Sequence, residues 1–193
     1  MGKIYIGLDP GKDGYVCIKA NGAYFFESMS QYKILTGKKL KSGKPQVKKG
    51  FSPEGLIKTA FDIKKMFNQT IGKDHTVVCG IEQVTGRHGW SAENNFNFGA
   101  VFGMQYLFAV LLEAKIEKIR PQKWQSFMYQ GFDKVMIPSS TGRTMVHDTK
   151  ATSKKVAQIL APQIDFRNTE KSKNLHDGKT DAFLICRYVE QKF

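Results

Sequence analysis

Four acidic residues stand at the edges of apolar segments, where acids are costly. Asp9 follows an alternating apolar stretch, and Glu82 ends the most apolar strand-like stretch of the chain. Asp177 and Asp181 lie four residues apart near the start of the last expected helix, so both point to one helix face. Ionised carboxylates beside core segments need a compensating cation, and clustered carboxylate oxygens suit Mg²⁺ or Mn²⁺. The set therefore predicts a divalent-metal site.

Each acid taken alone also has an ordinary explanation. Asp9 can be a turn residue before the Pro-Gly pair that follows it. Glu82 can be exposed at a strand end, Asp177 can meet the dipole of its helix, and Asp181 can be a solvated helical residue. The combination is more specific than any one of its members.

The elements that must position these acids are predicted from hydrophobic periodicity. Residues 3–9 and 15–19 alternate as strands, and an Asn-Gly hairpin signal leads to a third strand at 23–26. We expect these three strands to be antiparallel. Residues 76–84 are nearly continuous in apolar residues before the acid, as in a central buried strand.

Helices and one further strand account for most of the remaining chain. We expect a helix capped by Ser52, a long helix from Ser91 to about Lys115, a strand at 116–120, a helix from Pro121 to Phe127, a loop at 131–149, a helix at about 150–160 and a last helix from His176. This order predicts a single α/β domain over residues 1–193. The basic, Gly-rich segment 36–52 is expected to be an inserted loop or a small protruding hairpin.

The composition points to a polyanionic partner. Lys and Arg number 30 against 17 Asp and Glu, for a formal charge of +13. Nucleic acid is the commonest such partner, and an anionic membrane surface is the alternative. Without an apolar run of ~18 residues or a signal peptide, we expect a cytoplasmic protein that does not enter a membrane. The three scattered cysteines predict reduced core thiols.

Three segments resemble a known family. Residues 6–11 (IGLDPG), 80–84 (GIEQV) and 176–182 (HDGKTDA) look like the three active-site motifs of the RuvC family of Holliday junction resolvases, in the same order. The resemblance spans nearly the whole chain. It implies an RNase H-like α/β fold, with a central mixed five-stranded sheet flanked by helices. The compact chain suits a phage-encoded member.

The resemblance also implies an activity. Asp9, Glu82, Asp177 and Asp181 would hold two Mg²⁺ ions, for which Mn²⁺ would substitute, in an in-line phosphodiester hydrolysis. The products would carry 5′ phosphates and 3′ hydroxyls, and paired symmetric nicks would resolve a four-way junction. A homodimer would match the two-fold symmetry of that substrate.

The motifs depart from the family in the third segment. Many members place the last two ligands three residues apart, and that position here is Gly178. We therefore prefer the pair Asp177 and Asp181. His176 remains either a ligand or proton carrier, or a neighbour of the helix cap.

Lysines near the motifs match basic residues of the family. Lys123 resembles the family's basic residue near the scissile phosphate, where a lysine gives point-charge stabilisation. A second functional lysine is expected among Lys150, Lys154 and Lys155, with Lys154 preferred. A solvated helix face is the alternative for each.

Further residues are expected to contact DNA. Relatives often carry an aromatic residue directly after the second motif, where this chain has Thr85. Trp90 can stack on bases from further along, or it can pack on the long helix, and Arg87 can contact phosphate. The basic segment would grip a duplex arm through phosphate contacts, while two of the helix lysines named above, Lys150 and Lys155, would add to this surface. The segment's lysines are Lys38, Lys39, Lys41, Lys44, Lys48 and Lys49.

The long helix from Ser91 is apolar around more than one side. Burial against both the sheet and a second subunit would explain this pattern, and burial within one subunit is the alternative.

Three other functions remain open at this point. A different nuclease of the same fold could act on flaps, single strands or RNA–DNA hybrids. An actin-like kinase or ATPase shares a GLDPG-like phosphate loop, although 193 residues are few for its two lobes. A non-catalytic binder of branched DNA is disfavoured by four intact acids.

Overall fold

The centre of the molecule is a mixed five-stranded sheet. The computed structural model describes residues 2–11, 13–28, 31–72, 74–86 and 88–193, with side chains except at 31–36 and 47–51. The strand order is β3-β2-β1-β6-β7, and β6 and β7 run parallel to β1 while β2 and β3 form an antiparallel meander. The bounds are β1 Gly2–Leu8, β2 Tyr15–Ala20, β3 Ala23–Ser28, β6 His75–Glu82 and β7 Lys115–Ile119.

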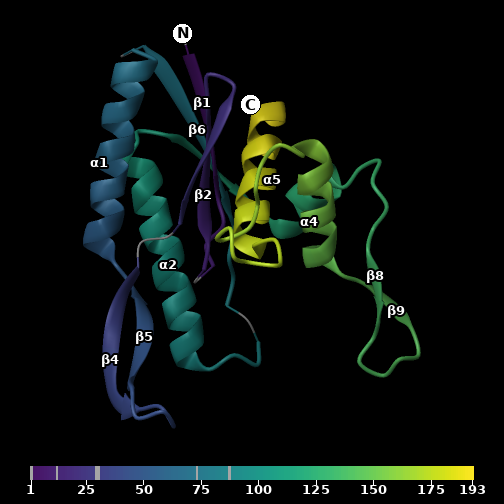
Figure 1. Cartoon of the computed structure of the whole chain (residues 1–193). Coiled ribbons are helices and arrows are strands. Elements are labelled where there is room, and N and C mark those ends of the chain that lie inside the picture. Colours follow the sequence, from purple (N-terminus) through teal and green to yellow (C-terminus); the bar gives the residue numbers. More distant parts are fainter. Residues whose placement is uncertain (1, 12, 29–30, 73, 87) are drawn as a thin grey trace.

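Helices cover both faces of this sheet (Figure 1). Helices α1 (Pro53–Thr70) and α2 (Ala92–Leu111) lie on one face, and α3 (Pro121–Met128), α4 (Thr149–Leu160) and α5 (Asp177–Lys192) lie on the other. The expected α/β fold, with a central mixed five-stranded sheet flanked by helices, is confirmed. Within the described residues, no helix combines the length and apolar character needed to cross a membrane.

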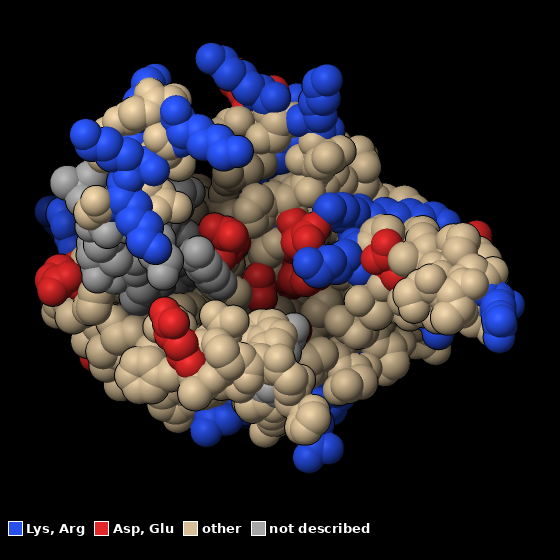
Figure 2. Space-filling view, turned by 90° about the horizontal axis from the view of Figure 1, so that it is seen from below, with Lys and Arg blue, Asp and Glu red and all other residues tan. Residues whose placement is uncertain are grey.

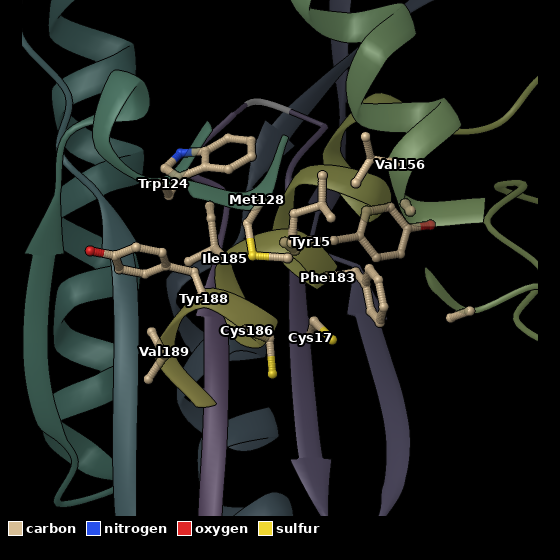
Figure 3. Close-up of a cluster of buried hydrophobic side chains, with 14 of the residues drawn as sticks. Tyr15, Cys17, Trp124, Met128, Val156, Phe183, Ile185, Cys186, Tyr188 and Val189 are labelled. Carbon is tan, nitrogen blue, oxygen red and sulfur yellow. The ribbon is translucent and has the colours of Figure 1, made fainter. Parts of the chain in front are cut away.

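Alternation along β1 divides the core into two layers. Ile4, Ile6 and Leu8 are fully buried on the side of α1 and α2. The other layer is built around α5, where Phe183, Ile185 and neighbouring side chains meet the sheet, α3 and α4 (Figure 3). All three cysteines are buried and free, as expected.

Two glycines allow α5 to lie very close to the sheet. Gly7 on β1 and Gly80 on β6 are partners in the parallel register. A Cβ atom at Gly7 would lie 2.1 Å from the carbonyl oxygen of Ala182, and one at Gly80 would lie 2.4 Å from Cγ2 of Val189. Any larger residue would push the helix away, so these two positions set how closely α5 approaches β1 and β6.

Two hairpins extend from this body (Figure 1). The first pairs β4 (Gln31–Lys39) with β5 (Pro45–Phe51), so the basic segment expected at 36–52 forms its tip and second strand. The second pairs β8 (Met136–Pro138) with β9 (Met145–His147). The expectation of a plain loop at 131–149 is therefore wrong, because three-residue strands leave no periodic pattern to detect.

The long helix is shorter than expected. It ends at Leu111 rather than near Lys115, because β7 begins at Lys115. Its N-cap is Ser91, as predicted, and the Ser52 cap of α1 is also confirmed: each hydroxyl accepts a hydrogen bond from a backbone N–H three residues later.

Candidate metal and nucleic-acid site

Parallel pairing brings the first two acids to the same end of the sheet. Leu8 and Ile81 are partners in the register of β1 and β6, and Asp9 and Glu82 are the next residues on the two strands. In a parallel pair, equivalent positions on neighbouring strands stay side by side. Two motifs that lie 73 positions apart in the sequence therefore meet at one edge.

The start of α5 brings the other two acids to this edge. A Cβ atom at Gly178 would lie 2.8 Å from Oδ2 of Asp9 and 2.7 Å from the carbonyl oxygen of Asp13. The Asp9 carboxylate thus lies against the first turn of the helix that carries Asp177 and Asp181. The same contact explains the departure at Gly178, because a side chain there would collide with Asp9.

No lysine or arginine pairs directly with Asp9 or Asp181 among the described residues, although the charge of Lys150 favours the ionised form of both. Burial, followed by the charges of Asp181 and Glu82, raises the pKa of Asp9 well above its ordinary value. Burial also raises the pKa of Asp181 to about 7, although a hydrogen bond from Ser153 opposes the shift. The buried Oδ1 of Asp181 has no hydrogen-bond partner among the described residues. Such a group is unfavourable when ionised, unless a cation joins it.

Asp177 differs from this pair because two lysines contact it. Lys150 lies 3.0 Å from Oδ2 and Lys154 lies 2.5 Å from Oδ1. Burial opposes the ionisation of Asp177, but the hydrogen bonds from both lysines outweigh it and hold the pKa below its ordinary value. Of the three candidate lysines, Lys150 and Lys154 therefore reach the acids, while Lys155 pairs with Asp133 at 3.8 Å.

Several residues that sequence reasoning missed hold the acids in place. The indole N–H of Trp124 donates to Oε2 of Glu82 at 2.8 Å, and Trp124 is fully buried in the α5-side core (Figure 3). The side-chain amide of Gln105 donates to the backbone carbonyl of Asp9 at 2.8 Å. Tyr129 contacts Ser153, the partner of Asp181, at 2.7 Å. The only available signal was a set of polar groups inside apolar helices.

The donor set matches a divalent cation. Among the described residues, no three His, Cys, Asp or Glu side chains are already arranged around a position for one metal ion. The buried carboxylate oxygen without a partner and the mutual repulsion of Asp9, Asp181 and Glu82 are nevertheless what bound Mg²⁺ would relieve. The residues therefore fit a metal that adds the missing positive charge.

Two other predicted site residues lie at the margin of the cluster. His176 is the N-cap of α5: its Nδ1 accepts from the backbone N–H of Lys179 at 3.4 Å, and its ring contacts Tyr15. Lys123 is exposed on α3, one residue before Trp124. Its ammonium forms no ion pair with the acids among the described residues.

Basic residues surround this cluster on one face of the molecule. In Figure 2, acidic side chains lie in a hollow, and lysine and arginine side chains rise on its rim. Lys38, Lys39, Lys41 and Lys44 are exposed at the β4–β5 hairpin tip. The side chains of Lys48 and Lys49, and the whole of Arg87, lie outside the described residues.

A pocket opens beside Glu82. It has a volume of about 300 Å³ and lies between the ends of β6 and β7, the start of α3 and Phe98 of α2. The ring of Trp90 meets Phe98 edge-on at 5.7 Å and stays 42% exposed. Trp90 thus packs on the long helix, which was one of its two expected roles, and still offers part of its ring to solvent.

Comparisons with known proteins give a likeness in structure only. No family model matches the chain, and no curated protein matches its sequence. A Thermus thermophilus RuvC structure is similar over 96% of this chain and 92% of that chain, with 13% identity and a TM-score of 0.44. T. thermophilus RuvC in complex with a Holliday junction substrate is similar over 96% and 91%, with 9% identity and a TM-score of 0.46.

Proposed function

We propose that this chain is a divalent-metal-dependent nuclease that cuts branched DNA, chiefly four-way junctions, by paired symmetric nicks. The observation that carries the proposal is the carboxylate pair Asp9 and Asp181, which the fold brings together without an ion pair to either acid among the described residues. A folded protein pays for such an arrangement in stability. The compensation comes when a metal ion and a phosphate occupy the site.

Asp9, Glu82, Asp177 and Asp181 are the proposed ligands. Two Mg²⁺ ions, or Mn²⁺ in their place, would supply the Lewis acidity that ionises a water molecule and stabilises the leaving 3′ oxygen. The chain itself orients these ligands. The hydrogen bond from Trp124 holds the carboxylate of Glu82 in position, as an outer partner would for a metal ligand.

Lys150 and Lys154 are proposed to act on the substrate phosphate. Both already lie at the edge of the cluster, through their contacts with Asp177. If Asp177 held a metal ion, its carboxylate would no longer pair with both lysines, and their ammonium groups would be available to the substrate phosphate. There they add positive charge beside the reacting group.

The charge of the molecule supports DNA as the substrate class. The formal charge is +13, and exposed lysines of the β4–β5 hairpin lie on the rim of the acidic hollow (Figure 2). The lysines on the rim attract a polyanion, but the acids in the hollow repel it unless bound cations neutralise them. Metal binding and DNA binding would therefore support each other.

We also propose a homodimer formed through α2. Phe96 is 76% exposed, and Val110 and Leu107 on the same helix are exposed as well. An apolar helix face of this kind is typical of a protein interface. A two-fold dimer would present two acidic sites to two strands of a four-way junction. Sedimentation of a monomer at micromolar concentration, with junction present, would reject the dimer.

Cleavage of a synthetic four-way junction tests the activity. With Mg²⁺, the purified protein should make symmetric nicks that DNA ligase can seal, and a linear duplex of the same sequence should survive. Asp9→Asn should bind the junction without cutting it. Equal cutting of the linear duplex would reject the junction preference and keep the nuclease, whereas ATP hydrolysis without any DNA cleavage would support the kinase-like alternative.

A further inference from the structure

The second hairpin exposes apolar side chains on both of its faces. We call residues 134–147, which include β8 and β9, the apolar ribbon. The strands pair Ile137 with Val146 and Pro138 with Met145, so these pairs lie on opposite faces. Met136, Ile137, Met145 and Val146 are 45%, 41%, 57% and 42% exposed. A two-stranded ribbon with four such side chains in water has no core of its own to bury them.

The apolar ribbon begins directly beside the acidic cluster. The hydroxyl of Thr152 on α4 accepts from the backbone N–H of Val135 at 2.9 Å and contacts Nε2 of His147 at 3.0 Å. The ring of His147 meets that of Tyr129 at 5.9 Å. Tyr129 in turn contacts Ser153, the partner of Asp181. The ribbon is therefore anchored to the residues that hold a proposed metal ligand.

The position and charge of the ribbon match DNA. The apolar ribbon carries Lys134 and Arg143 and no acidic residue, and hydroxyl side chains fill its tip. It projects beyond α4, on the opposite side of the acidic hollow from the basic β4–β5 hairpin (Figures 1 and 2). DNA that reaches the acids from the basic hairpin would thus meet the ribbon next.

We propose that the apolar ribbon inserts its exposed side chains against unstacked bases at the branch point of the DNA. Ile, Met and Pro are side chains that proteins insert between base steps, and a two-stranded β-ribbon fits a DNA groove. A four-way junction offers such bases at its centre, while a continuous duplex does not. The ribbon would then select the branch, and the basic hairpin would hold an arm through its phosphates. This inference rests on the proposed function.

Polar substitutions on the apolar ribbon test the inference. The combined variant Met136→Gln, Ile137→Thr, Met145→Gln and Val146→Thr should keep its melting temperature, because all four side chains are exposed. Met145→Gln alone, at the most exposed of the four, gives a milder second variant. Ile159→Gln is the matched control, since Ile159 is 53% exposed on α4 outside the ribbon. Affinity is measured in EDTA for a four-way junction and for a linear duplex of the same sequence, with 2-aminopurine at the branch point.

The inference predicts a loss that is confined to branched DNA. The combined variant should bind the junction about tenfold more weakly, because its apolar contacts with the unstacked bases are lost. It should bind the linear duplex unchanged, and it should not raise the 2-aminopurine fluorescence as the parent does. The single variant should show the same pattern with a smaller loss, and Ile159→Gln should match the parent.

Three results would overturn the inference. Unchanged junction affinity and fluorescence in the combined variant would exclude base contacts by the ribbon. Equal losses on junction and duplex, with a loss of dimer in sedimentation, would assign the ribbon to contact with a second copy of the chain. A parent protein that does not prefer the junction would overturn the proposed function as well, and this failure appears in the parent rather than in the variants.

Discussion

Helix α5 carries a partly buried acid near each end, and the surroundings of the two acids differ. Near the C-terminus, Glu190 is held by Lys19, by Arg187 at 2.7 Å and by the hydroxyl of Tyr24 at 3.5 Å. Burial opposes the ionisation of Glu190, but the hydrogen bonds and positive charges of Lys19 and Arg187 outweigh it and lower its pKa. Near the N-terminus, burial raises the pKa of Asp181 to about 7, and Oδ1 of Asp181 has no partner among the described residues.

The difference separates a structural acid from a functional one. The Glu190 end is disfavoured by the helix dipole, yet the chain supplies two cations there. The Asp181 end is favoured by the dipole, yet more acids lie beside it, and the two lysines there, Lys150 and Lys154, pair with Asp177 rather than with Asp181. A cluster of acidic side chains with raised pKa values is typical of a binding or catalytic site. The following predictions test this contrast, from the largest expected effect to the smallest.

Neutralising Asp181 should strongly lower the cleavage rate, whereas neutralising Glu190 should leave it nearly unchanged. Asp181→Asn should lower the junction cleavage rate by at least about 1,000-fold, because loss of a ligand should exceed the 10- to 100-fold cost typical of outer partners. Glu190→Gln should stay within about twofold of the parent. Single-turnover cleavage at saturating protein measures both. Equal losses of cleavage rate in the two variants would contradict the distinction between a functional Asp181 and a structural Glu190.

The stability of the metal-free protein should depend on pH through Asp181. Between pH 3.8 and about 7, only the unfolded state has this group ionised, so the unfolding free energy should fall as pH rises. The maximum slope is about 1.4 kcal/mol per pH unit. The unfolding free energy of Asp181→Asn relative to the parent should therefore rise with pH across this range and become constant above about pH 7. Urea unfolding in EDTA measures it, and a constant difference between the two proteins would contradict the raised pKa.

Glu190 should matter to stability rather than to cleavage. Glu190→Gln should lower the unfolding free energy by about 2 kcal/mol, between the values for exposed and fully buried ion pairs. The side chains of Lys19 and Glu190 are only 18% and 21% exposed, so solvent does not fully replace the lost charge. Added Mg²⁺ should raise the melting temperature of Glu190→Gln as it does for the parent. A failure of Mg²⁺ to stabilise this variant would link the two ends of α5.

The hydrogen bond from Trp124 to Glu82 tests whether a neighbour of a proposed metal ligand affects cleavage. Trp124→Phe removes the N–H that donates to Glu82, and it should lower the cleavage rate about tenfold while shifting its Mg²⁺ dependence to higher concentration. The loss of buried ring area will also lower stability. Cys79→Ala, at another fully buried position, serves as a control for stability loss alone. If it shifts the Mg²⁺ dependence equally, Trp124 has only a packing role.

Much of the fold could be predicted because its signals are local. The alternation of 3–8 and the Asn-Gly turn define the antiparallel strands, and both turn residues indeed have positive φ, 48° and 79°. Ser52 and Ser91 mark helix starts by their hydroxyls. The strands β8 and β9 escaped detection because each spans only three residues, and their apolar side chains face water rather than a core.

Of the candidate site, the sequence predicts the acidic residues but not the residues that hold them in place. Asp9, Glu82 and Asp181 stand out because they interrupt apolar patterns, and the register of β1 and β6 brings the first two together. No local pattern reveals that Trp124 reaches Glu82 from 42 residues away, or that Gln105 reaches the backbone of Asp9. These contacts follow from the packing of whole helices on the sheet.

The central claim is that the acids at the start of α5 bind divalent cations. A crystal soaked in Mn²⁺, with anomalous diffraction recorded for the parent and for Asp181→Asn, tests it most directly. We predict anomalous density about 2.1 Å from carboxylate oxygens of Asp9, Glu82 and Asp181, and none at Glu190, with the density lost in the variant. Well-ordered crystals whose parent protein shows no density at these acids, or shows it only elsewhere, would contradict the account.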